Sequence, residues 1–277
     1  MRHATGGDED LDGSAIMLIA RKGTMRLRTS ALHSALVALT LLAAAAPARA
    51  DDIKVFSSVA MRAVVEEVAA RFERDTGHRV VATFGIAAVL KGRIESGESY
   101  DLAILTPAQA DELIAGAKAA GPRTVIARSA MGLMVKAGAP KLDVANVDAF
   151  KRTLLAAKSL TYVPGGASGV AFLATAKQLG ILQAVEAKTK AGTSGDEVSA
   201  NVTTGAAEIG ILPVSEILPV KGAALGGIFP SEVQTYIVMA GVVSPKAPQG
   251  ARDFLARLTA ATSDAVITAK GMERVKP

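Results

Sequence analysis

The stretch that decides the fold is residues 53–105, IKVFSSVAMRAVVEEVAARFERDTGHRVVATFGIAAVLKGRIESGESYDLAIL. Short apolar runs alternate in it with segments whose apolar residues recur at helical spacing. The predicted elements are strand 53–56, helix 60–75, strand 79–84, helix 87–96 and strand 101–105. Pro107 then opens another helix, at a position where proline is tolerated. Such alternation predicts a mostly parallel sheet with helices on both faces.

The rest of the chain repeats this style without a linker, an internal repeat or a low-complexity stretch. We expect an α/β protein of two lobes, each a mostly parallel sheet flanked by helices, with crossing strands between them. Strands are predicted within 123–135 and at 160–163, 185–190, 209–212 and 234–243; helices at 147–157, 170–179, 195–204, 215–218, 249–259 and 263–269.

The N-terminal region has the order of an export signal. Arg26 and Arg28 precede an apolar run at 31–46, and Ala48-Arg49-Ala50 follows as a small-residue cleavage motif. A transmembrane anchor is the alternative, but the run is shorter than the roughly 20 residues that span a bilayer. We therefore expect an N-terminal extension plus signal peptide at 1–50, cleaved after Ala50, with translation starting at Met1, Met17 or Met25.

Composition narrows the function classes. Six of the 31 Lys/Arg and four of the 26 Asp/Glu lie in residues 1–50, which leaves the rest at a net charge of +3. These charges are interspersed and aromatic residues are few, so nucleic-acid binding is not expected. The chain has no cysteine, which excludes a thiol nucleophile, a thiolate metal site and a lipid-modified cysteine at the cleavage site. His78 is the one histidine after residue 50, so a multi-histidine metal site is excluded as well.

Loops at the carboxyl ends of the predicted strands are the candidate binding site, because ligands of open parallel sheets bind there. Several of these loops run into helices, whose first N–H groups bind anions. The candidate residues in these loops are Ser57, Ser58, Ala60 and Arg62, then Gly85 and Ala87, then Thr106, then Gly166 and Ser168. Taken singly, Ser57, Ser58 or Ser168 can be simple helix caps. The glycine-rich loop at 164–169 matches neither a Walker A loop nor a dinucleotide fingerprint.

Charged candidates are fewer. Arg62 is expected in the first turn of its helix, where a cation opposes the helix dipole, so it is either a ligand-pairing group or a solvated arginine. Glu216 follows the predicted strand 209–212 and is a candidate to face the same cleft. His78 and Arg93 are interpreted as surface residues.

The sequence resembles the molybdate-type periplasmic solute-binding proteins, of the type II periplasmic binding fold, over nearly all of 51–272. The matching segments are Val55-Phe56, Arg71-Phe72-Glu73 with Thr76-Gly77, Thr83-Phe84-Gly85, 93–97, 101–104, 176–181, 205–210 and 269–272. The resemblance implies lobe one at 51–133 and 238–277 and lobe two at 134–237, with the ligand clamped between them.

The resemblance also implies an oxyanion pocket, and this chain departs from it. Hydroxyl donors expected near the first two helix starts fall on Ala60 and Ala87, and an expected tyrosine falls on Pro213. Ser168 and Gly195 remain from that pocket. Because an unfilled donor set loses affinity and selectivity, a larger organic carboxylate is favoured over molybdate.

These features favour a periplasmic, cofactor-free and metal-free receptor that delivers a small anion to an inner-membrane ABC permease. It is expected to be monomeric and not embedded in the membrane. The alternative is a cofactor-free isomerase, since periplasmic aconitate isomerases are similar to this family. That reaction needs one positioned base, for which the candidates are Glu216, Tyr162, Tyr236 and Lys91. A ligand sensor with a membrane partner is a third hypothesis.

Overall fold

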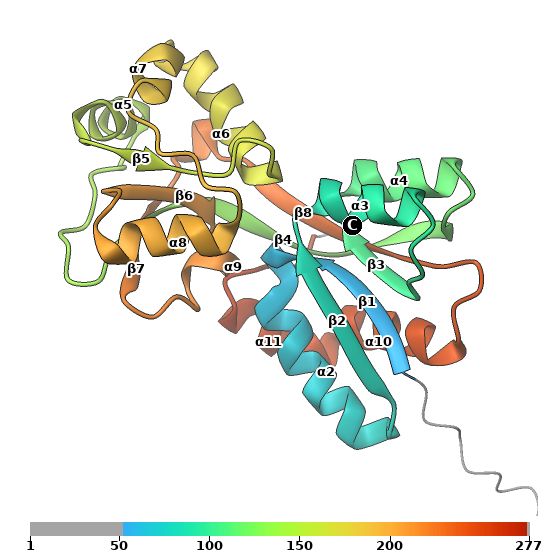
Figure 1. Ribbon diagram of the computed structural model, residues 1–277. Helices are drawn as coiled ribbons and strands as arrows, with labels where there is room; N and C mark the ends of the chain where they lie inside the picture. Colours follow the sequence, from blue (N-terminus) through green and yellow to red (C-terminus); the bar gives the residue numbers. More distant parts are fainter. Residues whose placement is uncertain (1–51, 276–277) are drawn as a thin grey trace, which may run out of the picture. The chain divides into compact units, whose positions relative to one another are not determined.

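The computed structural model describes residues 52–275. The predicted extension, signal peptide and cleavage site lie outside these residues. Elements keep the labels of Figure 1, in which the first helix is α2. The strands are β1 (Asp52–Ser58), β2 (Arg79–Gly85), β3 (Leu102–Leu105), β4 (Ala120–Lys136), β5 (Leu160–Thr161), β6 (Ile209–Pro213), β7 (Ala223–Ile228) and β8 (Tyr236–Val243).

The helices alternate with the strands as predicted as far as α6, after which α7 and α8 follow without an intervening strand. They are α2 (Arg62–Thr76), α3 (Ala87–Glu95), α4 (Pro107–Ala115), α5 (Val147–Ala156), α6 (Ala167–Gln178), α7 (Leu182–Glu186), α8 (Gly195–Thr204), α9 (Val214–Ile217), α10 (Gln249–Thr259) and α11 (Asp264–Ala269). Short 3-10 turns lie at Val59–Met61, Ser231–Val233 and Ala261–Ser263.

The strands form one sheet in two parts, with the order β2-β1-β3-β8-β4-β6-β5 and β7 paired to β4. In the first part β1 runs parallel to β2 and β3, and β8 is antiparallel to β3 and β4. The long strand β4 joins the parts, because it pairs with β8 up to Ala130 and with β6 and β7 from Met131 onward. The predicted α/β fold class is confirmed, whereas the lobe boundaries at 51–133, 134–237 and 238–277 stay a prediction.

Helices cover both faces of each part of the sheet (Figure 1). In the first part α2, α10 and α11 pack on one face and α3 and α4 on the other. In the second part α8 and α9 lie across the sheet from α5, α6 and α7. Loops at the carboxyl ends of strands from both parts border one common pocket.

Helix α2 shows how the sequence determines this packing. Its apolar positions at helical spacing, among them Val64, Val68 and Phe72, are buried as the pattern predicts. The Phe72 ring packs on Phe254 of α10 at a centroid distance of 5.2 Å. Burial of each such side chain stabilises the fold by roughly 1.5–3 kcal/mol. Gly77 ends the helix in the left-handed conformation, with φ of 77°.

Two local predictions are corrected. The predicted strand 185–190 is wrong, because Val185 is a buried residue of α7 and only Thr189 bridges β5. The helix predicted at 170–179 begins earlier, so Ser168 lies in the first turn of α6 rather than in the loop before it. Strand β7 was not predicted, since AALGGI carries no β-branched or aromatic pattern until its last residue.

Candidate functional site

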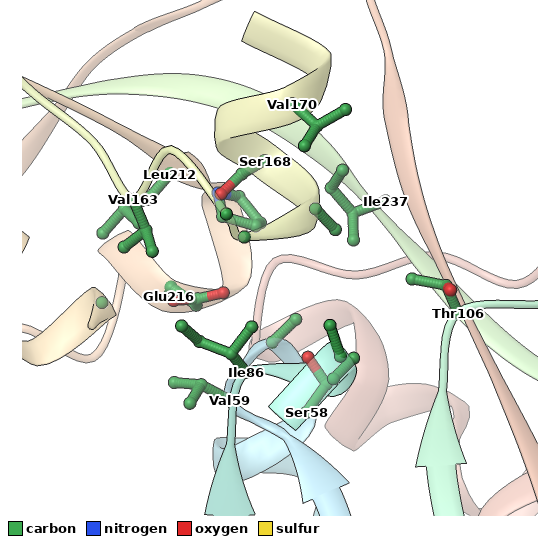
Figure 2. Close-up of a pocket in the computed structure, with 18 of the residues that line it drawn as sticks. Ser58, Val59, Ile86, Thr106, Val163, Ser168, Val170, Leu212, Glu216 and Ile237 are labelled. Atoms are coloured by element: carbon green, nitrogen blue, oxygen red, sulfur yellow. The ribbon is translucent and has the colours of Figure 1, made fainter. Parts of the chain in front are cut away.

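A pocket of about 460 Å³ opens where loops from both parts of the sheet meet (Figure 2). This volume lies within the range of small-molecule sites. Its walls come from the carboxyl ends of β1, β2, β3, β5 and β6, as expected for an open parallel sheet. The lining residues are Ser58, Val59, Ala60, Gly85, Ile86, Ala87, Ala88, Thr106, Gln109, Val163, Gly165, Gly166, Ala167, Ser168, Val170, Gly195, Leu212, Pro213, Glu216 and Ile237.

The structure brings most of the predicted site residues together at this pocket. Those that line it are Ser58, Ala60, Gly85, Ala87, Thr106, Gly166, Ser168, Gly195 and Pro213. Ser57 does not, because it is fully buried and its hydroxyl donates to the carbonyl of Ser58. Arg62 lies beside a neighbouring cavity instead.

Two helices point uncapped N-termini at the pocket. Helix α3 begins at Ala87 and α6 at Ala167, and neither has a side-chain cap hydrogen bond. Ser168 therefore does not cap α6, which was the alternative to a binding role, and it lines the pocket. Unpaired N–H groups with the positive end of the helix dipole favour an anion in this space.

The close packing of the glycine-rich loop fixes the start of α6. A side chain at Gly169 would collide with the carbonyl oxygen of Val163, so this position requires glycine. The 163–169 segment thus folds back tightly before the helix begins. This contact places Gly166 and Ser168 at the pocket wall.

Gln109 is a polar lining residue that the sequence interpretation missed. Its side-chain carbonyl accepts hydrogen bonds from the Thr106 N–H at 3.3 Å and from the Thr106 hydroxyl at 2.8 Å. The Thr106 hydroxyl is therefore occupied as a donor, and the Gln109 amide NH₂ remains as a donor at the pocket. The spacing of a threonine three residues before a glutamine, as in a capping box, was the available signal.

Glu216 is the only ionisable side chain among the described lining residues of this pocket. It enters from α9, immediately after β6, and Figure 2 shows its carboxyl directed into the space below Ser168 and above Ile86. A Cβ at Gly195 would collide with Glu216 Oε2, so the glycine at the start of α8 makes room for this carboxyl. Burial, and secondarily the charge of Asp196, raise the pKa of Glu216 to about 7, against an opposing effect of Arg62.

A second cavity of about 200 Å³ lies on the other side of Glu216. Arg62, Glu66 and Asp196 line it, and the Arg62 guanidinium pairs with Asp196 at 3.2 Å. Arg62 also lies over the Phe84 ring at 5.2 Å. Its Nε and the Ser215 hydroxyl are buried without a hydrogen-bond partner among the described residues. Both pockets therefore share Val59, Gly195 and Glu216 as a common wall.

The other three candidate bases lie away from the pocket. Lys91 is held by Glu95 at 2.9 Å and Glu112 at 2.7 Å. Tyr162 is buried against Phe172. Tyr236 is an exposed residue at the start of β8, and the Arg128 guanidinium lies over its ring at 4.0 Å. Within residues 52–275 no cluster of three or more His, Asp or Glu side chains is arranged for a metal ion. No helix of that region is long and apolar enough to cross a membrane.

The fold and the pocket define an α/β solute-binding architecture. Comparisons with known proteins support the same class. The sequence matches the family described as bacterial extracellular solute-binding protein over residues 53–273. An aconitate isomerase from a Pseudomonas species is 31% identical over 264 residues, covering 90% of this chain and 97% of that protein. The molybdate-binding protein ModA of Azotobacter vinelandii is 28% identical over 205 residues, covering 71% and 77%.

The solved periplasmic molybdate-binding protein of Azotobacter vinelandii has the same fold, with a TM-score of 0.69. It is 19% identical and the match covers 81% of this chain and all of that one. This chain belongs to the bacterial extracellular solute-binding protein family, as a divergent relative of the molybdate-binding type.

Proposed function

We propose that the chain binds a small organic carboxylate in the 460 Å³ pocket and delivers it to an inner-membrane ABC permease. The observation that carries the proposal is the donor set of the pocket. It combines hydroxyls of Ser58 and Ser168, the Gln109 amide and the uncapped N-termini of α3 and α6. These donors are neutral and spread around the walls, which suits an extended anion.

The departures from a molybdate site support the organic ligand. Ala60, Ala87 and Pro213 line the pocket and carry no hydroxyl. A compact tetrahedral oxyanion needs many directed donors at short range, and three of them are replaced here. The same replacements enlarge the space, so a di- or tricarboxylate fills it better.

A thermal-shift titration of residues 51–277 tests this proposal. A ligand that binds only the folded state raises the melting temperature, by an amount set by its concentration relative to Kd. We expect stabilisation by succinate, citrate or trans-aconitate and weaker stabilisation by molybdate or sulfate. If molybdate alone stabilises the protein, the assignment of an organic ligand is wrong. If no anion stabilises it, the proposal that the protein is a receptor for anions is wrong.

Export to the periplasm belongs to the same proposal. It is supported by the family and by the signal-like residues 26–50, which the structure does not describe. N-terminal sequencing of the protein from a periplasmic extract is expected to begin at Asp51. A retained residue 1, 17 or 25 in that fraction contradicts cleavage after Ala50.

A cofactor-free isomerase is the second candidate, and Glu216 favours it. Moving a double bond between two carbons needs a base that removes a proton and an acid that returns one. A carboxyl whose pKa is about 7 can do both near neutral pH, and Glu216 alone among the four candidate bases lines the pocket. The 31% identity to an aconitate isomerase supports the same reading. Incubation with trans-aconitate and detection of the cis isomer by chromatography decides the matter.

A further inference from the structure

The position of Glu216 conflicts with an anionic ligand unless the Glu216 carboxylate loses its negative charge. Its carboxyl is the only ionisable group among the described residues of the main pocket, and no hydrogen bond or ion pair of residues 52–275 engages it. No lysine or arginine in the part of the chain that the structure describes lines this pocket to offset it. An ionised Glu216 would therefore repel the carboxylates that the proposed function places beside it.

The second cavity does not supply the missing positive charge. Arg62, from α2, lines this cavity with Glu216 and its Nε has no partner among the described residues, but the charge of its guanidinium is already offset by Asp196 of α8 at 3.2 Å. Glu66 of α2 adds another negative charge to the same cavity. Among the described residues, the charged side chains that line this cavity with Glu216 are therefore one positive and two negative.

The proton needed to remove the conflict is easily acquired. The pKa of Glu216 is already about 7 in the ligand-free protein, because the carboxyl is withdrawn from solvent and faces Asp196. A negative ligand in contact raises that pKa further, since like charges disfavour the ionised form. Protonation also gives the Glu216 carboxyl an O–H donor. A ligand carboxylate oxygen can accept a hydrogen bond from it.

We propose that Glu216 takes up one proton from solvent when a carboxylate ligand binds and donates it in a hydrogen bond to that ligand. The proton moves to a Glu216 carboxyl oxygen, no covalent bond of the ligand changes, and the complex gains one positive charge. This inference rests on the proposed function and deepens it, because it makes Glu216 the residue that selects ligands able to accept a hydrogen bond from a carboxylic acid. Binding is then coupled to pH.

Isothermal titration calorimetry measures the proton directly. Residues 51–277 are titrated with trans-aconitate, citrate and succinate at pH 8.5, in buffers of different ionisation enthalpy. We expect uptake approaching one proton per ligand, because the free carboxyl is ionised at this pH. Between pH 8 and 9.5, where the probes are fully ionised, the affinity is expected to fall about tenfold per pH unit.

Glu216→Gln is the diagnostic variant, since its neutral amide keeps a donor in place of the protonated acid. It is expected to bind without proton uptake and with an affinity that no longer falls between pH 8 and 9.5. Glu186→Gln, on the exposed end of α7 and away from both cavities, is the matched control and is expected to behave as wild type. If Glu216→Gln does not fold, Asp196→Asn serves instead. It removes a charge that raises the pKa of Glu216, so the free carboxyl is more ionised at pH 7 and proton uptake per ligand at that pH is expected to exceed that of wild type; an unchanged or smaller uptake contradicts the inference.

The outcomes separate the two proposals. Absence of binding by all three probes to the wild type refutes the proposed function and this inference with it. Binding without proton uptake, or the same pH slope in Glu216→Gln as in wild type, refutes this inference alone. Uptake that persists in Glu216→Gln assigns the proton to another group and also overturns it.

Discussion

Replacing Glu216 by glutamine is expected to remove a pH-dependent loss of stability from the ligand-free protein. The pKa of Glu216 is raised in the folded protein to about 7 from an ordinary value of 4.5. Between these values the unfolded chain has released the proton and the folded chain retains it. The contribution of Glu216 to the free energy of unfolding is therefore fully present below pH 4.5. It decreases as pH rises toward 7 and is constant above pH 7.

The size of this effect follows from the difference between the two pKa values. Each pKa unit corresponds to about 1.4 kcal/mol, so the free energy of unfolding is expected to fall by about 3 kcal/mol between pH 4 and 8 because of Glu216 alone. For a protein of this size that is a shift of about 6–12 °C in Tm. The glutamine variant cannot ionise and lacks this contribution.

Urea unfolding of wild type and Glu216→Gln at half-unit steps from pH 4 to 8.5 measures it. Other titrating groups are common to both proteins, so the difference between their free energies of unfolding isolates Glu216. That difference is expected to change by about 3 kcal/mol in favour of glutamine as pH rises. A difference that stays constant with pH shows that the carboxyl is solvated in the folded state, and the reasoning on its environment is then refuted.

Three further substitutions test the packing around the site. Gly195→Ala is expected to displace the Glu216 carboxyl, lowering carboxylate affinity at least tenfold by calorimetry while costing only about 1–3 kcal/mol in urea unfolding. Gly169→Ala meets the carbonyl of Val163, a backbone atom that cannot rotate away, and is expected to abolish ligand-induced thermal stabilisation. Phe254→Ala is expected to destabilise the fold by about 3–5 kcal/mol without changing ligand specificity in the thermal-shift panel, since the ring packs on α2 away from the pocket.

The sequence predicted the fold class because its local signals agree with the final structure. Apolar spacing in α2 and Gly77 at its end specify the helix, and the buried run of β3 specifies a central strand. The apolar pattern gave the wrong secondary structure where tertiary contacts determine it. Strand β7 has small residues that pair only because β4 passes beside them, and Val185 gave the same apolar signal in a helix as it would in a strand.

The candidate site was predictable as a set of strand-end loops but not in its detail. Ser57 and Ser58 are neighbours, yet only Ser58 faces the pocket, because alternate residues of a strand point to opposite faces. The Gln109 side chain is held by its hydrogen bond from Thr106. Sequence spacing suggests this contact but does not show that the amide lies at the pocket. The role of Glu216 depends on Gly195 and Asp196, residues that fold next to it from another helix.

The protonation state of one carboxyl in the complex separates the two candidate functions. A receptor gains affinity when Glu216 is protonated, because the acid donates to the ligand and the repulsion is removed. An isomerase that uses Glu216 as its base needs the ionised form in the complex, since only that form can remove a ligand proton. Tricarballylate, a saturated tricarboxylate that has no double bond to move, reports this state without turnover. Proton uptake on its binding favours the receptor, and binding without uptake, together with loss of turnover of trans-aconitate in Glu216→Gln, favours the enzyme.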